Sequence, residues 1–118
     1  MENKFQVEFL EEAKEFPDGL DERFRKKILY NIWKSCSSND KELFKKLNNN
    51  IWEFRTIYNR QHYRLFAFWD KTKNDNTVVI STHGYIKKTG KAPKGEIEHA
   101  EKLREKYFNE KSERNENI

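Results

Sequence analysis

Five side chains of this sequence have the chemistry that proton transfer beside a bound anion requires: Glu53, Arg55, Arg64, His83 and Lys88. A carboxylate or an imidazole can accept a proton, and an ammonium group can donate one. Guanidinium groups stabilise developing negative charge and bind oxyanions bidentately, which an ammonium group cannot do. The sequence therefore contains the parts of an anion-binding acid–base site, provided that the fold brings them together.

The charge distribution favours an anionic ligand in the same part of the chain. Residues 52–95 contain 9 Lys or Arg and 3 Asp or Glu, whereas residues 1–51 contain 10 of each. Four lysines and no acid lie between Lys87 and Lys94. Such an excess attracts a polyanion, and nucleic acid is the most common one in a cell. Solvated surface lysines explain a basic segment equally well when it is considered alone.

Composition predicts one small domain, 1–118, with an aromatic core. The chain has 118 residues, of which 35% are hydrophobic, 37% charged and 14% aromatic. Each buried aromatic ring can remove roughly 150–250 Å² from water, so the aromatics compensate for the scarcity of aliphatic residues. No apolar run approaches the length of about 20 residues that a membrane span needs. The start of the chain has no signal-like apolar region, and the lone Cys36 excludes an internal disulfide, so we expect a cytoplasmic protein without membrane contact.

Periodicity and turn signals predict the secondary structure. We expect a strand at 5–9, a helix at 11–16 ended by Pro17-Asp18-Gly19, a longer helix capped by Asp21, and a short helix at 40–47. Strands follow at 51–58, 62–69 and 77–83, where 84–90 continues the third strand or turns out of it. Pro93 opens a last helix, and 111–118 is expected to be a frayed tail. This order predicts an α+β domain, with helices packed on one face of a small antiparallel sheet.

Alternation along the two central strands decides whether the reactive side chains can meet. Glu53 and Arg55 point to one face of their strand, and the aromatic residues point to the other, towards the helices. If paired residues have numbers with an odd sum, Arg64 lies on the Arg55 face, and His83 can join from the third strand. An even sum would place an unpaired guanidinium among the aromatics, which is costly. We therefore predict the odd register, with the cluster bordered by Lys87, Lys88 and Lys91.

Simpler explanations apply to several of these residues. Glu53 and Arg55 also fit a surface ion pair without function, worth about 0–1 kcal/mol. His62 and His99 fit surface positions, and no two histidines have the spacing of a metal site, so we expect no metal and no cofactor. Cys36 ends an apolar helical stripe and fits the core. Three aromatics fit the core better than a base-stacking platform: Trp52, Phe68 and Trp69.

Five segments resemble the HigB-like, phage-derived branch of the RelE/ParE toxin superfamily. They read LFKKL at 43–47, IWEFR at 51–55, YRLFAFW at 63–69, THGYIKKT at 82–89, and EIEHA at 96–100 after Pro93. The resemblance implies a RelE-like fold, with two N-terminal helices against an antiparallel sheet. It also implies the toxin of a type II toxin–antitoxin pair, an endoribonuclease that cuts mRNA at the A site of the translating ribosome.

The partners implied by this resemblance are a helix-turn-helix, HigA-like antitoxin and the ribosome-bound mRNA, with operator DNA bound only through the antitoxin. Arg64 stands where RelE-like toxins have an arginine that contacts the scissile phosphate, and Arg55 matches the arginine that closes their preceding strand. Lys87 and Lys88 match the lysine pair of this branch. Glu53 departs from the pattern, because RelE-type enzymes have a lysine there.

With that activity, Arg64 would bind the scissile phosphate with support from Arg55. Glu53 or His83 would accept the proton of the 2′-hydroxyl, and Lys88 would act as the acid or as a second oxyanion partner. The RNA backbone would be held by Lys87, Thr89 and Lys91. Two alternatives remain at this stage: a ParE-like gyrase poison with the same fold, and a nucleic-acid-binding module that is not an enzyme.

Overall fold

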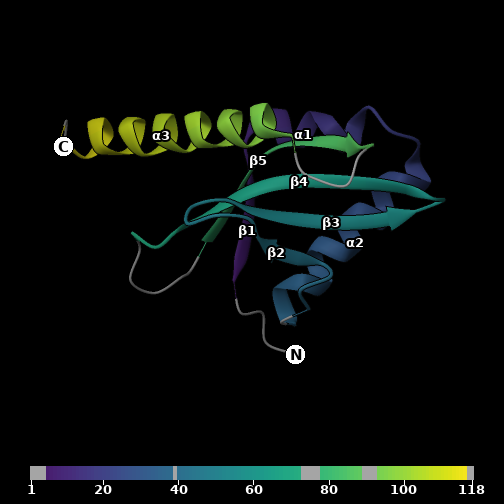
Figure 1. Cartoon of the computed structure of the whole chain (residues 1–118). Helices are drawn as coiled ribbons and strands as arrows, with labels where there is room; N and C mark the ends of the chain where they lie inside the picture. The colour runs from purple at the N-terminus through teal and green to yellow at the C-terminus, as the bar shows by residue number, and fades with distance from the viewer. Residues whose placement is uncertain (1–4, 39, 73–77, 89–92, 117–118) are drawn as a thin grey trace.

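The computed structural model describes residues 5–38, 40–72, 78–88 and 93–116. Along the chain these residues form eight elements (Figure 1): β1 (Gln6–Phe9), α1 (Glu11–Asp18), α2 (Glu22–Ser37), β2 (Phe44–Lys46), β3 (Trp52–Tyr58), β4 (Gln61–Asp70), β5 (Val78–Lys87) and α3 (Lys94–Glu116). The predicted α+β class is confirmed, and the boundaries of most predicted elements agree closely with the structure.

The five strands form one mixed sheet in the order β1-β5-β4-β3-β2. β2, β3, β4 and β5 pair antiparallel, as expected, but β1 pairs parallel with β5, through Val7 and Val79 among others. The prediction of a purely antiparallel sheet was therefore wrong. The partners of this parallel pair are far apart in the chain, so no turn signal in the sequence specifies their pairing.

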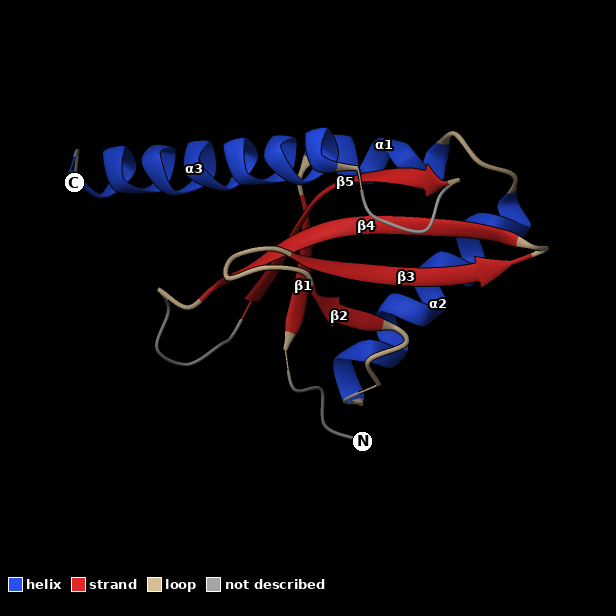
Figure 2. Ribbon diagram, in the orientation of Figure 1, coloured by secondary structure: helices blue, strands red, loops and turns tan. Residues whose placement is uncertain are grey.

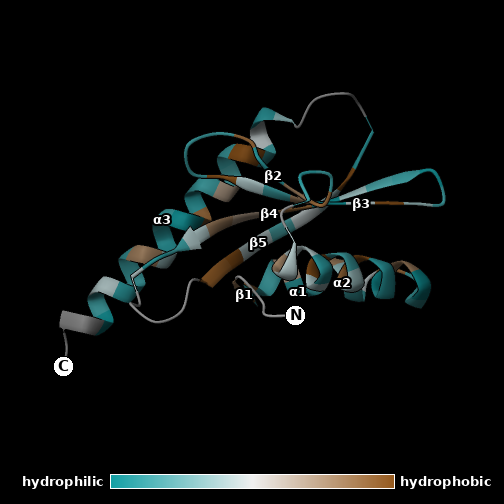
Figure 3. Ribbon diagram, turned by 90° about the horizontal axis from the view of Figure 1, so that it is seen from below, coloured by the Kyte–Doolittle hydropathy of each residue, from teal (hydrophilic) through white to brown (hydrophobic). Residues whose placement is uncertain are grey.

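Helices cover both faces of the sheet, which corrects the expectation of helices on one face (Figures 2 and 3). α1 and α2 pack on the first face, over a core of aromatic and aliphatic side chains that includes Ile28, Phe54 and Leu65. α3 packs on the second face, where Ala100 and Ile97 meet Phe66, Phe68 and Ile80. Its C-terminal turns project beyond the sheet (Figure 1).

The expected helix at 40–47 is absent, because tertiary pairing overrides local helical preference there. Phe44 belongs to β2 and stacks on Phe54 of β3, with ring centroids 4.3 Å apart. The amide of Arg55 donates to the carbonyl of Leu43 at 2.8 Å, which extends this pairing. Strand formation at this point satisfies the outer edge of β3 and buries the Phe44 ring.

The end of α3 is ordered by contacts with the end of β4. Lys111 Nζ donates to Asp70 Oδ2 at 2.7 Å, and the Tyr107 hydroxyl donates to the same oxygen at 2.5 Å. The segment 111–116, which we expected to fray, therefore continues the helix. The described helices include none with the length and apolar character of a transmembrane span.

Candidate active site

The β3–β4 hairpin has the predicted odd register. Arg55 lies directly opposite Arg64, and Glu53 lies opposite Phe66. The two-residue turn between the strands has positive φ at both Asn59 (51°) and Arg60 (64°), as hairpin turns of this length require. Arg55 and Arg64 consequently share the second face of the sheet, away from α1 and α2.

A β-bulge then brings β5 into the cluster. The β4–β5 register shifts between Leu65 and Ala67, so that Phe66 faces one extra residue of β5. On one side of the shift Ile80 lies opposite Phe68 and packs under α3, whereas on the other side Tyr85 lies opposite Arg64. Without the extra residue, strand alternation would direct Tyr85 to the opposite face. The bulge thus lets one strand serve both the α3 core and the cluster.

Glu53 joins the two arginines of this cluster. Its Oε1 lies 3.3 Å from Nε of Arg64 and 3.6 Å from Nε of Arg55. The side chains of Glu53 and Arg64 are 3% and 1% exposed, whereas that of Arg55 is 27% exposed. Arg64 therefore lies beneath its neighbours, and Arg55 is the guanidinium of this group that a ligand reaches first.

The cluster carries an excess of positive charge around one carboxylate. Burial raises the pKa of Glu53, although the cations Arg64, Lys87, Arg55 and Lys45 oppose the rise. Burial lowers the pKa of Lys87, and the neighbouring charge of Arg64 lowers it further. A lysine whose pKa is lowered releases its proton more readily, so Lys87 has the property that a proton donor at neutral pH requires.

Four buried polar atoms in the described residues have no hydrogen-bond partner, and all four belong to this cluster: Glu53 Oε2, Arg55 Nε, Arg64 Nε and Tyr85 Oη. Both arginine Nε atoms lie close enough to Glu53 for an ion pair, but not in hydrogen-bonding geometry. Buried polar groups are normally satisfied, and each exception calls for an explanation. Three of these atoms are donors once Tyr85 is neutral, so the arrangement suits a ligand that is rich in oxygen acceptors.

His83 is directed towards α3 and not towards the arginines. Its Nε2 lies 3.2 Å from Glu96 Oε2, and its Nδ1 lies 3.2 Å from the Thr82 hydroxyl. Phe66, the β4 neighbour of Glu53, packs against the His83 ring with centroids 5.1 Å apart. Burial lowers the pKa of His83, against the opposing charge of Glu96. The sequence placed His83 on the correct face but could not show that Glu96 of α3 would occupy Nε2 while Thr82 of β5 occupies Nδ1.

The lysine segment is only partly described. Lys87 ends β5 on the cluster face, opposite His62 of β4. Lys88 follows the end of the strand and is exposed. The expected RNA-binding residues Thr89 and Lys91 lie outside the described residues. Of the two consecutive lysines, Lys87 is therefore the one that lies on the face of Arg64 and is influenced by its charge.

Three further residues of the cluster were missed as site residues. Tyr85 lies opposite Arg64, and burial together with the charge of Glu53 raises its pKa to about 12, so its phenol is neutral. His62 Nδ1 lies 3.3 Å from Arg64 Nη2, and Lys45 of β2 lies opposite Glu53. For Lys45 the sequence held no usable signal, because its segment was expected to be helical. Tyr85 could have been found because it lies two residues from both His83 and Lys87, the spacing that places strand residues on one face.

Chemically, the cluster offers an accessible guanidinium, a neutral phenol, a lysine of lowered pKa and one buried carboxylate on a single face. This set can bind an anion and provides one group to accept and one to donate a proton.

None of the curated proteins matches the sequence. Residues 11–105 match the family described as phage derived protein Gp49-like (DUF891), which is associated with RelE-type toxins of toxin–antitoxin systems, and the chain therefore belongs to this phage-derived Gp49-like family.

Proposed function

We propose that this protein is the toxin of a type II toxin–antitoxin system, of the HigB-like branch, and that it cleaves mRNA on the translating ribosome. The observation that carries the proposal is the cation-rich cluster on β3, β4 and β5, whose four unpartnered polar atoms are all concentrated around Glu53. Membership of the Gp49-like family supports the toxin assignment. A helix-turn-helix antitoxin would be the partner that holds the toxin inactive.

In the proposed reaction the RNA supplies its own nucleophile. The 2′-oxygen attacks the adjacent phosphorus as its proton passes to Glu53, whose raised pKa makes it a better acceptor than a free carboxylate. The bond from phosphorus to the 5′-oxygen breaks, and Lys87 protonates the departing oxygen. The products end in a 2′,3′-cyclic phosphate and a 5′-hydroxyl.

Arg55 and Arg64 have unequal parts in this scheme. Arg55 is the more exposed of the two and binds the phosphate first through its guanidinium group, with the Tyr85 hydroxyl as a further donor. Arg64 lies beneath and adds positive charge close to Glu53 and Lys87. Preorganised charge of this kind acts on the dianionic phosphorane, where negative charge exceeds that of the ground state.

Arg55→Ala tests the proposal with a smaller risk of unfolding than Arg64→Ala, because Arg55 is the more exposed of the two arginines. Purified protein would be added to ribosomes programmed with mRNA, and new 5′-hydroxyl ends would be mapped by primer extension and kinase labelling. Loss of one preorganised donor costs about 10²–10³-fold in rate. Arg114→Ala, at an exposed position on α3, is the matched control.

Three outcomes would contradict the proposal. Undiminished cleavage by Arg55→Ala would show that this cluster is not the active site. Absence of new RNA ends with the unmodified protein would show that the protein does not cleave mRNA under these conditions. Gyrase–DNA cleavage complexes in place of new RNA ends would instead identify a ParE-like poison.

A further inference from the structure

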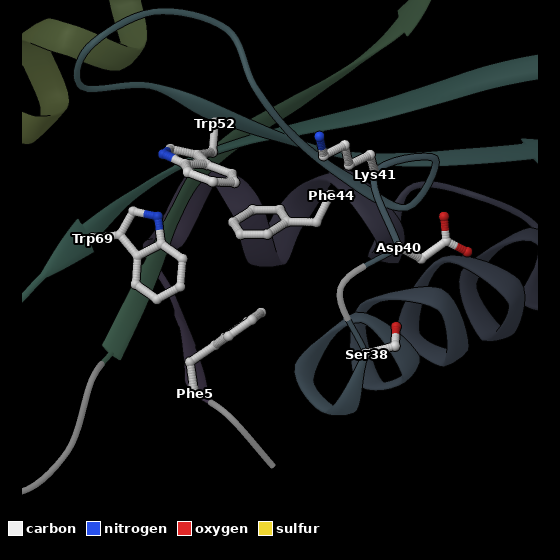
Figure 4. Close-up of a pocket in the computed structure, with 7 residues that line it drawn as sticks. All are labelled: Phe5, Ser38, Asp40, Lys41, Phe44, Trp52 and Trp69. Atoms are coloured by element: carbon white, nitrogen blue, oxygen red, sulfur yellow. The ribbon is translucent and has the colours of Figure 1, made fainter.

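Two cavities meet at the end of the sheet where β3 begins and β4 ends, and Trp52 and Trp69 line both of them. The first has a volume of about 450 Å³ and is lined by Phe5, Ser38, Asp40, Lys41, Phe44, Trp52 and Trp69 (Figure 4). The second has a volume of about 510 Å³ and is lined by Lys46, Asn49, Asn50, Trp52, Trp69, Lys71 and Arg104. Neither includes Glu53, Arg55 or Arg64.

The first cavity is aromatic. The two indoles lie edge to face at 5.7 Å and 79°, Phe5 lies 5.1 Å from Trp69, and Phe44 stacks on Trp52 at 4.9 Å. Figure 4 shows these four rings gathered around the open space. Both indoles pack against the core, as the sequence suggested, and remain partly exposed. The volume lies within the range of roughly 300–1,000 Å³ that is typical of ligand sites.

The second cavity is cationic. Its charged lining consists of Lys46, Lys71 and Arg104, and two asparagine amides complete the polar surface. Lys71 also lies over the Trp69 ring, with Nζ 5.7 Å from the centroid. An aromatic surface beside converging cations is the arrangement that single-stranded nucleic acid needs, since bases stack on rings while phosphates bind cations.

Consecutive lysines of the edge strand β2 connect this region with the candidate active site. Lys45 lies opposite Glu53, whereas Lys46 lies opposite Trp52 and lines the second cavity. Both side chains are exposed and leave opposite faces of β2. Positive charge therefore continues around the edge of the sheet, from one face to the other.

We propose that the two cavities form a nucleotide subsite for single-stranded RNA. A base occupies the aromatic cavity against Trp52 and Trp69, and an adjoining phosphate is bound by Lys46, Lys71 and Arg104. Asp40, at the aromatic cavity, can accept a hydrogen bond from an amino group of the base. The identity of the ligand as RNA rests on the proposed function, and the subsite would hold the substrate strand as it passes around β2 to the cleavage site.

The test measures binding without cleavage. The exposed Trp33 is first replaced by Phe, so that fluorescence reports on Trp52 and Trp69. The probe is a short oligoribonucleotide that carries 2′-O-methyl groups throughout and therefore cannot be cleaved by its own 2′-oxygen. An abasic strand of the same charge is the matched probe. We expect the probe with bases to quench the indole fluorescence and the abasic strand to leave it nearly unchanged.

Paired variants then separate the two cavities. Lys46→Glu combined with Lys71→Glu should weaken binding about tenfold or more relative to Lys14→Glu combined with Lys102→Glu, which makes the same change of charge at exposed positions elsewhere. The salt slope should also fall, by about 0.7 for each lost phosphate contact. Trp69→Leu should weaken binding about tenfold relative to Trp69→Phe, which keeps a ring for stacking.

The proposed subsite would be contradicted if the abasic strand quenched the fluorescence as much as the probe with bases. It would also be contradicted if the two double lysine variants bound the probe with equal affinity. These results are independent of the activity, because the probe cannot react. If these binding tests fail while the unmodified protein still cleaves mRNA, only the inference of a nucleotide subsite is contradicted. Binding as described, without any cleavage by the unmodified protein, would contradict the proposed enzymatic function alone.

Discussion

Arg64 and Glu53 form an almost completely buried ion pair, in which Nε of the guanidinium lies 3.3 Å from Oε1 of the carboxylate. Taking both charges out of water costs free energy that their attraction only partly returns, so the pair by itself adds little to stability. Its members depend on each other, because removal of Glu53 leaves the buried Arg64 guanidinium without its counter-charge, and removal of Arg64 leaves Glu53 with the more distant Arg55.

This dependence predicts non-additive effects on the free energy of unfolding. Arg64→Met should lower it by about 3–5 kcal/mol, because the buried Glu53 carboxylate loses its closer counter-charge and keeps the more exposed Arg55, 3.6 Å away. Adding Glu53→Gln to that variant should restore part of the loss. Urea denaturation of both single variants and the double variant measures the coupling, and simple additivity would show that the two side chains do not interact.

The proposed role of Lys87 as proton donor predicts how the cleavage rate depends on pH at high pH. As the proposed proton donor it must be protonated, whereas Glu53 must be deprotonated to accept a proton. Cleavage should therefore require a pH above the pKa of Glu53, and should decline as pH rises through the pKa of Lys87, which burial and Arg64 hold below the 10.5 of free lysine. Lys87→Met should abolish this decline together with most activity, about 10²–10⁴-fold. Lys88→Met is the control, and a similar loss in that variant would assign the proton donor to Lys88.

Asp70 predicts a pH dependence of stability. Burial alone would raise the pKa of its carboxyl, but hydrogen bonds from Lys111, Thr72 and Tyr107 outweigh burial and hold the pKa below its usual value. The folded state therefore binds this proton less tightly than the unfolded chain. The resulting stability is present above pH 3.8, the ordinary value, and is lost as pH falls through the folded pKa.

Asp70→Asn should accordingly lower the free energy of unfolding by about 2–3 kcal/mol at neutral pH, and by much less in acid. Urea denaturation at a series of pH values would follow the difference between variant and unmodified protein. A difference that does not change with pH would mean that the hydrogen bonds do not depend on the charge of Asp70.

Gly84 predicts a steric effect at the contact between β5 and α1. A Cβ at this position would lie 2.5 Å from Cγ of Phe16, and the ring cannot bend away as a flexible chain end would. Gly84→Ala should therefore lower the free energy of unfolding by about 1–3 kcal/mol. Phe16→Leu added to Gly84→Ala should cost less than the sum of the two single changes. Thermal unfolding of the three variants measures this, and additive losses would argue against the predicted clash.

The sequence alone determined most of the local structure and one decisive register. Apolar periodicity located α1, α2 and the start of α3, and alternation located β3 and β4. The odd register followed from a large energetic difference, because the alternative places the Arg64 guanidinium among the aromatics of the first face. Where one choice of pairing is much more costly than the other, the pattern of residues is enough to specify it.

Tertiary structure alone decided the remaining features, which depend on partners distant in the chain. Phe44 and its neighbours form a strand because they pair with β3, and β1 pairs parallel with β5 because the two bury Val7 and Val79 together. The bulge opposite Phe66 places Tyr85 and Lys87 on the Arg64 face, and Glu96 of α3 holds the His83 side chain away from the two arginines. Local propensity contains no information about such contacts, since each depends on which distant surface the segment meets.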